Sequence, residues 1–468
     1  MGGDARRLIA RTVPVSDATG RESASRLRPP RAQAGLSIEW AVVGMTAMAI
    51  LAIGTISPPL LTALHVNYAA TGGNILEKMH PATYFAFLAF ALLLLRGGDP
   101  IGELSRIVGS TRLLLIYFFS CVLIVFQSVV LKRPFTGVVD AFLLPAVLCL
   151  VIWSLTPAQR RPLVWVVHFV IWLNIALGYY EFISKRRLVP ITVDGLVVTG
   201  DWRSTALLGL PLVAAGVVAM YIMALMLKPR TQAPPIYALP LLVVAMASLM
   251  VFGGRTALVF TIIVLAGIVA LNLAKLVRGE RVAMTTVIVA TCFVMVLGAL
   301  IPILFGTGVF DKMIDRFSSD NGSANARVAG FHLLMLFDAR EIVFGTAPGR
   351  ANALQSMMGL DYGIENFWIS SIVQYGLIGT VSITIGLAFF FGEILKRAAP
   401  GARIAALFLV ITAASSVSFS SKNIILAAYV VLIVLLLPRA QAVQQTVRAP
   451  LPAGGGRRFA YAPTMPMR

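Results

Sequence analysis

Apolar runs long enough to cross a lipid bilayer recur along nearly the whole chain. A helix needs about 20 apolar residues to cross the hydrocarbon core, because each residue advances the helix by about 1.5 Å. Such runs occupy residues 40–61, 80–95, 113–131, 138–155, 163–183, 206–227, 236–252, 256–274, 285–305, 367–392, 404–419 and 424–437. Their number and length predict an all-α, polytopic membrane protein with about 12 transmembrane helices.

The composition excludes two other classes of protein. Hydrophobic residues make up 58% of the chain and charged residues 13%, whereas soluble domains average about 45–50% and about 25%. So few charged side chains cannot cover so much apolar surface in water. Disordered chains need low hydrophobicity. A water-soluble globule and a largely disordered chain are therefore both excluded.

The formal net charge of +19 would suggest a nucleic-acid partner in a soluble protein. Here most of the excess Lys and Arg falls in the two tails and in alternate short loops, all on one side of the predicted topology. Basic loops stay in the cytoplasm. The charge therefore predicts a multi-pass protein of the cytoplasmic membrane with both termini inside, and no nucleic-acid partner.

The chain divides into three parts. Residues 1–39 form a polar, Arg-rich tail, and residues 439–468 form a Gly- and Pro-rich tail; both are predicted to be disordered and cytoplasmic. Residues 40–438 form the transmembrane domain. Within it, the residues Gly253-Gly254-Arg255 separate two apolar runs, and we expect a tight surface turn there, because an arginine at the middle of the membrane is costly.

One predicted outer loop, residues 306–366, is much longer than the others. Long ordered loops usually serve a function. Apolar residues at helical spacing over 309–317 predict a helix lying on the membrane surface, and residues 327–337 and 351–358 predict two further helices. We therefore expect a helical cap over the outer face.

Residues that could carry chemistry are confined to the outer face. The sequence has no nucleotide-binding loop, zinc-protease motif or Cys/His metal cluster, so we expect neither a metal nor a cofactor. Charged residues are almost absent from the middle of the runs, and Asp140 and Glu181 fall near the outer ends of theirs. This absence disfavours an ion-coupled transporter, which tends to carry charges at the midplane.

Four outer arginines are candidate binding residues: Arg203 before a run, Arg255 in the two-glycine turn, and Arg327 and Arg350 in the long loop. Arginine binds phosphate oxygens in bidentate fashion. These side chains could therefore hold a lipid pyrophosphate whose tail stays in the bilayer. The alternative is that they reach to lipid headgroups or form ion pairs within the loops.

The pair Glu365-Asn366 stands at the mouth of the run 367–392 and is followed, nine residues later, by the glycines of a Gly376-x-x-Gly379 motif. A carboxylate in a partly dry site can act as a general base toward a sugar hydroxyl, and Asn366 can bind hydroxyls. Both residues could instead cap the helix. The small residues allow a neighbouring helix to pack closely.

Together these motifs resemble the O-antigen ligase and polysaccharide polymerase superfamily of bacterial inner membranes. The resemblance covers roughly residues 200–385 and rests on four motifs in order: Arg203 before Leu208-Gly209-Leu210-Pro211; Gly253-Gly254-Arg255-Thr256; Arg327 before Glu341-Ile342-Val343-Phe344-Gly345-Thr346-Ala347-Pro348-Gly349; and Asn366, nine residues, then Gly376-x-x-Gly379.

The resemblance implies a GT-C-like fold with a periplasmic cap and a metal-independent glycosyltransferase. The donor would be an oligosaccharide on undecaprenyl pyrophosphate in the membrane lipid, with Arg203, Arg255, Arg327 and Arg350 available to hold the pyrophosphate. Glu365 stands where the family ligases carry histidine. This substitution favours polymerisation of exopolysaccharide or O-antigen repeat units over ligation to another acceptor. A polymerase of this kind could have a chain-length regulator as partner.

A lipid-linked oligosaccharide flippase is the alternative from a different class, since it also has about 12 spans. Such a flippase would show two similar halves and charges within its cavity, and the sequence shows neither.

Overall fold

The computed structural model describes residues 31–68, 74–190, 192–193, 196–197, 203–228, 238–280, 295, 298, 323–360, 363–416, 419 and 422–439. This part of the chain is mostly helical and contains one short hairpin besides the connecting segments. In the hairpin, β1 (Thr192–Val193) pairs antiparallel with β2 (Leu196–Val197).

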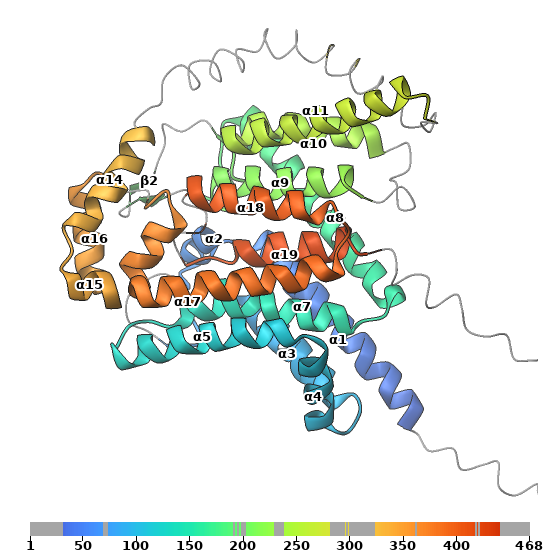
Figure 1. The fold of residues 1–468 in the computed structure, drawn as a ribbon, viewed down its shortest axis with the longest axis horizontal. Helices are drawn as coiled ribbons and strands as arrows, with labels where there is room; N and C mark the ends of the chain where they lie inside the picture. The colour runs from blue at the N-terminus through green and yellow to red at the C-terminus, as the bar shows by residue number, and fades with distance from the viewer. Residues whose placement is uncertain are drawn as a thin grey trace, which may run out of the picture.

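The helices form a bundle with a small cap at one end (Figure 1). They are α1 (Arg31–Thr55), α2 (Pro58–Ala63), α3 (Pro81–Leu95), α4 (Pro100–Ser110), α5 (Arg112–Val130), α6 (Thr136–Val138), the π-helix η1 (Val139–Leu143), α7 (Leu144–Ser154), α8 (Pro157–Ser184), α9 (Pro211–Met226), α10 (Ala238–Phe252), α11 (Arg255–Val277), α14 (Ser323–Met335), α15 (Ala339–Phe344), α16 (Pro348–Met357), α17 (Phe367–Arg397), α18 (Ala402–Ser415) and α19 (Ile425–Leu436). Each of the other predicted apolar runs coincides with one of these helices or a consecutive set, whereas only residues 295 and 298 of the run 285–305 are among the described residues.

In the described residues, 6 helices are long and apolar enough to cross a membrane. The pair α3 and α4, bent by 110°, would make a seventh span. Four shorter apolar helices, which include α9, α18 and α19, accompany them. The protein is therefore a helical, multi-pass membrane protein, as the apolar runs predicted.

The centre of the bundle is made by α7, α9 and α19, whose residues are buried on nearly all sides. A helix that is apolar all round is stable only where it is enclosed. By contrast, α11 leaves large apolar side chains exposed along its length, among them Ile263 and Leu271. This helix therefore forms part of the surface that lipid tails would cover.

The N-terminal part differs from the prediction in two respects. Helix α1 begins at Arg31, inside the segment 1–39 that was predicted to be disordered. The predicted run 40–61 is two helices, because α1 ends at Thr55 and Pro58 starts α2. Proline favours the first turn of a helix and has no N–H to continue the preceding one.

The cap comprises α14, α15 and α16, which lie together at the end of the bundle where α17 starts (Figure 1). It has its own apolar core, in which Leu333, Phe337 and Ala351 pack against Ile369 and Val373 of α17. Two of the expected loop helices are present as α14 and α16, and α15 is an addition. The expected surface helix 309–317 lies outside the described residues.

Two glycines fix the cap onto α17. Gly376 lies inside α17 with φ 72° and ψ 176°, a backbone conformation that kinks the helix and is open essentially only to glycine. A side chain on Gly376 would collide with the Val343 carbonyl, and Gly345 of the cap, with φ 84°, fits against the same kink. The glycine motif near the start of α17 thus packs against the cap at Gly376.

Helix α5 and the segment that follows it hold this junction from the other side. The Gln127 amide donates to the carbonyls of Phe344 (3.0 Å) and Tyr375 (2.8 Å). The Arg133 guanidinium donates to the carbonyls of Phe344 (2.7 Å) and Gly345 (2.6 Å). These side chains satisfy the carbonyls left without helical partners at the kink and at the end of α15. The cap is thereby held in one position over the start of α17.

Candidate functional site

Arg203 and Arg255 lie in two segments that the fold joins. The N–H of Ser204 donates to the carbonyl of Val251 at 3.2 Å, so the segment after the hairpin lies against the turn between α10 and α11. Arg203 is next to Ser204 in the chain, and Arg255 is the first residue of α11. Both arginine side chains are half-buried. The fold therefore brings into one junction two candidate residues that are 52 positions apart in the sequence.

The expected tight turn before Arg255 is present. Gly253 has φ 68°, which favours glycine. A side chain on Gly254 would collide with Ala215 of α9, so this glycine lets the turn sit directly on that helix. The turn makes Arg255 the first residue of α11, at the positive, N-terminal end of the helix, where an anion is favoured.

Glu181 has a structural role beside this junction. Its carboxylate, 3% exposed, accepts hydrogen bonds from the backbone N–H groups of Leu188 (2.8 Å), Thr205 (2.7 Å) and Ala206 (2.9 Å). A buried carboxylate is stable when its oxygens accept several such bonds. Glu181 thus fixes the backbone of the segment that carries Arg203.

Glu365, Asn366 and Arg327 form a second group at the start of α17. The Arg327 Nε lies 3.3 Å from the Glu365 Oε2. The Asn366 side chain accepts hydrogen bonds from the N–H groups of Trp368 (2.9 Å) and Ile369 (3.2 Å), and so it caps α17. Capping was the alternative role of Asn366 in the sequence, and the structure shows this role.

Arg350 makes a different ion pair, with its Nε 3.2 Å from the Glu341 Oε1. This pair lies within the cap, between α16 and α15. The fold thus does not bring Arg350 onto Glu365; it gives each of the two candidate arginines of the cap, Arg327 and Arg350, a carboxylate of its own. An exposed ion pair of this kind contributes only about 0–1 kcal/mol, so either arginine can exchange its carboxylate for another anion at little cost.

Contacts between neighbouring helices place both groups at the same end of the bundle. The Asn366 Nδ2 donates to the carbonyl of Ala414, at the end of α18, at 3.4 Å. Helix α18 in turn packs against α11, where the rings of Phe408 and Phe260 are 5.2 Å apart. The end of α18 therefore connects the start of α17, with Glu365, to the side of the bundle where Arg255 starts α11.

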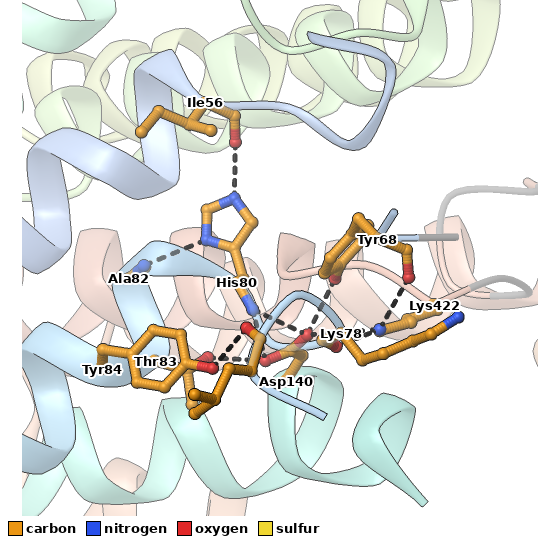
Figure 2. A network of polar contacts seen from close by, with 10 residues as sticks. Ile56, Tyr68, Lys78, His80, Ala82, Thr83, Tyr84, Asp140 and Lys422 are labelled. Carbon is orange, nitrogen blue, oxygen red and sulfur yellow. Dashed lines mark hydrogen bonds and ion pairs between the residues drawn. The ribbon is translucent and has the colours of Figure 1, made fainter. Parts of the chain in front are cut away.

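A third group surrounds Asp140, which is fully buried in η1 (Figure 2). Its carboxylate accepts hydrogen bonds from the Tyr68 hydroxyl (2.9 Å), the Thr83 hydroxyl (2.7 Å) and the His80 backbone N–H (3.1 Å). The His80 ring contacts the Ile56 carbonyl through Nε2 (2.6 Å), and its Nδ1 accepts from the Ala82 N–H (3.1 Å). The ring is therefore neutral, with its proton on Nε2.

Lys422 closes this group from the segment between α18 and α19 (Figure 2). Its ammonium donates to the carbonyls of Tyr68 (3.1 Å) and Lys78, lies 4.0 Å from the Asp140 Oδ2, and stands 3.9 Å from the centre of the Tyr68 ring. Burial lowers the pKa of Lys422 to about 8, although the Asp140 carboxylate opposes the shift. Lys422 thus ties three segments together: that of Tyr68, that of Lys78 and that of Asp140.

The Asp140 group adjoins the start of α17, because the ring of Phe142 in η1 contacts that of Phe367 with their centroids 6.4 Å apart. The sequence located Asp140 near the end of its run but gave no reason to connect it with Tyr68, His80 or Lys422. Lys422 stands alone as a charged residue between two apolar runs. In a chain with so few charges, this isolated position is the signal from which the sequence could have predicted a specific polar contact for Lys422.

No group of three His, Cys, Asp or Glu side chains suited to a metal ion occurs among the residues that the structure describes. Neither the protein-family models nor the curated proteins include a match to this chain.

Proposed function

We propose that this protein is a glycosyltransferase of the bacterial inner membrane that acts at the periplasmic face. Its donor is a glycan carried on undecaprenyl pyrophosphate, and it joins repeat units of an exopolysaccharide or O-antigen. We propose further that the chain has 12 spans in a GT-C-like architecture and that both termini are cytoplasmic. A chain-length regulator could be its partner. The four short apolar helices and the run 285–305 would complete the span count.

The observation that carries the proposal is the junction of the Arg203 segment with the Arg255 turn. It places two half-buried arginines in a region bounded by helix ends, in a bundle whose outer helices would contact lipid. Arginine forks and a helix N-terminus are suited to a phosphate-bearing lipid headgroup. The excess positive charge of the chain falls on the predicted cytoplasmic side, so the outer arginines are not part of a general basic bias.

In the proposed reaction, the acceptor hydroxyl attacks the anomeric carbon of the donor. The bond between that carbon and the pyrophosphate oxygen breaks, and undecaprenyl pyrophosphate leaves. Arg203 and Arg255 stabilise the negative charge that develops on the leaving group. Glu365 accepts the proton of the hydroxyl as general base. No metal is required, because the arginines supply the positive charge.

The test is polymer production in cells that lack the native gene and carry Arg255→Ala, Glu365→Gln or the control Arg278→Ala. Arg278 caps the opposite end of α11 and is exposed. We expect the first two variants to lose most of the polymer, since the lost effects are worth about 10²–10⁴-fold in rate. The control should make normal polymer, and immunoblots of membranes should show equal protein.

The lipid-linked intermediates that accumulate in the variants distinguish a polymerase from a ligase. A polymerase variant should accumulate single repeat units on the lipid carrier. If long polymer instead accumulates on the carrier without reaching its final acceptor, the protein is a ligase. Normal polymer in Glu365→Gln would exclude Glu365 as the base, and normal polymer in Arg255→Ala would contradict the pyrophosphate site.

A further inference from the structure

We propose that the end of the bundle opposite the cap binds an anionic phospholipid, with its phosphate at Lys396, Arg397 and Arg439 and its acyl chains against α4. This inference goes beyond the proposed function and does not depend on it. Helix α17 starts at the cap and ends at Arg397, whose guanidinium donates to the carbonyl of Ser110, the last residue of α4. Figure 1 accordingly shows α4 at the end of the bundle away from the cap.

Cations outnumber carboxylates where α17 ends. The Glu393 carboxylate, 7% exposed, lies 2.9 Å from the Arg397 Nη2 and 3.9 Å from the Lys396 Nζ. Arg439 joins them, since its backbone N–H donates to the Arg397 carbonyl (3.1 Å) and its Nη1 to the Lys396 carbonyl (3.0 Å). Three positive charges thus gather at one carboxylate. Their mutual repulsion favours a further anion at this position.

A fourth cation, Arg160 of α8, reaches the same place through Trp153. The Arg160 guanidinium donates to the carbonyls of Trp153 (2.9 Å) and Leu155 (3.0 Å). The Arg397 guanidinium stands 4.7 Å from the centre of the Trp153 ring. The carbonyls and the ring hold both guanidinium groups in place and remove none of their positive charge. A preference of basic residues for one side of the membrane does not require that they meet in this way.

The cationic cluster is open to a ligand from outside. The Lys396 side chain is 62% exposed and the Arg397 side chain 33% exposed, and Arg439 is exposed as well. Phosphate oxygens accept hydrogen bonds from a guanidinium fork and from an ammonium. A zwitterionic lipid carries its own cation beside the phosphate, whereas the cluster has a net positive charge. It therefore favours a lipid whose headgroup is net negative.

Helix α4 supplies the apolar surface for the acyl chains. It turns from α3 by 110°, so it runs along the end of the bundle and not parallel to α3. Ile101 (81% exposed) and Leu104 (41% exposed) lie on one face of α4. On another face, Arg106 pairs with Glu103 at 2.6 Å. One apolar and one charged face are typical of a helix that lies in the headgroup region of a membrane.

The experiment is native mass spectrometry of the full-length protein in detergent, titrated with phosphatidylglycerol or with phosphatidylcholine of the same acyl chains. The test variant is Lys396→Gln with Arg439→Gln, which leaves Arg397 and its contacts in place. The control is Lys275→Gln with Arg278→Gln, which removes two exposed cations at the end of α11. Both variants lose the same charge, so a difference between them reports position alone.

We expect the wild type to prefer phosphatidylglycerol, and each cation lost from the cluster to weaken its binding by about five-fold. The control should bind like the wild type, and Lys396→Arg with Arg439→Lys should retain the preference. Equal losses in the test and control variants would show an effect of general charge and overturn the site. A wild type without preference for phosphatidylglycerol would overturn it too.

Two further arms test the source of the phosphate and the place of the acyl chains. Free glycerol phosphate at the lipid's concentration should not displace phosphatidylglycerol, and displacement would contradict a lipid site. Ile101→Gln with Leu104→Gln should weaken the binding of phosphatidylglycerol without touching the cationic cluster. Undiminished binding by that variant would overturn the placement of the acyl chains on α4.

Discussion

Replacing Gly376 by alanine should detach the cap from α17. The glycine has φ 72° and ψ 176°, a conformation that costs an L-residue about 1–3 kcal/mol. The added methyl carbon would also collide with the Val343 carbonyl and lie 2.5 Å from the Gly345 nitrogen. Both obstacles are backbone atoms of the same segment, so a side-chain rotation cannot relieve them and the end of α15 must move away.

The cost of that movement follows from the hydrogen bonds at the junction. The Thr346 N–H donates to the Val373 carbonyl at 2.8 Å, and Gln127 and Arg133 donate to the Phe344 and Gly345 carbonyls. Each bond is worth about 0.5–1.5 kcal/mol net, and those from Arg133 about 1.5–3 kcal/mol. With the strain, losing all of these bonds would cost about 5–12 kcal/mol, which is comparable to the roughly 5–15 kcal/mol that stabilises a typical domain.

The assay is trypsin digestion of the purified protein in nanodiscs together with a thermal melt. We expect the Gly376→Ala protein to be cut in the cap, after exposed Arg340 or Arg350, at a protease dose that leaves the wild type whole. The control is Gly392→Ala in the same helix, where the nearest atom, the Leu113 Cδ1, is 3.7 Å away. The control should melt no lower than wild type, because alanine favours a helix over glycine by about 1 kcal/mol. Equal protease resistance of Gly376→Ala and Gly392→Ala would show that the cap is not held by the kink.

Three further outcomes follow from the site. The pKa of Lys422 is about 8 in the folded protein, against an ordinary value of 10.5. Between pH 8 and pH 10.5 the unfolded chain therefore binds more protons than the folded protein, so stability rises with pH. Over this window the melting temperature of the wild type should rise relative to that of Lys422→Met. Parallel pH curves for the two proteins would show that the Lys422 amine keeps its ordinary pKa. Asn366→Ala should destabilise the start of α17 by about 1 kcal/mol, which faster amide exchange at Trp368 and Ile369 would reveal. Asn366→Ser should keep the slow exchange, because serine can also accept these N-terminal hydrogen bonds. Fast exchange in both variants would contradict the capping role of residue 366. Glu181→Gln should lower the melting temperature by several degrees, because one amide cannot accept all three backbone hydrogen bonds as a carboxylate does; an unchanged melt would show that these bonds add nothing.

The positions of the helices could be predicted from the sequence, because apolar runs and helix breakers act locally. The run 163–183 lies within α8, and the glycines at 253 and 254 separate α10 from α11 as expected. The errors arose where a run alone carries too little information. A run of apolar residues does not show the break at Pro58, and polarity alone did not show that α1 begins at Arg31.

The candidate site was predictable only in part. The arginines could be chosen from their chemistry and from their positions at the ends of runs. Their partners could not, since Arg327 and Glu365 are separated by 38 positions. The Gly376-x-x-Gly379 pattern predicted a closely packed neighbouring helix, and α5 packs there, with Gln127 and Ile124 within 4 Å of a side-chain carbon placed at Gly379. The pattern did not predict that the cap packs on Gly376. The Asp140 group was missed because its members come from four separate segments.

The sequence by itself determined that this is a helical membrane protein. In hydrocarbon every backbone N–H and carbonyl must be satisfied within the protein, and a helix does so locally, residue by residue. The tertiary structure decided which polar side chains meet: Arg327 with Glu365, Lys422 with Asp140, and the Arg203 segment with the Arg255 turn. These contacts depend on how the helix ends pack against one another, and composition and spacing along the chain do not specify that packing.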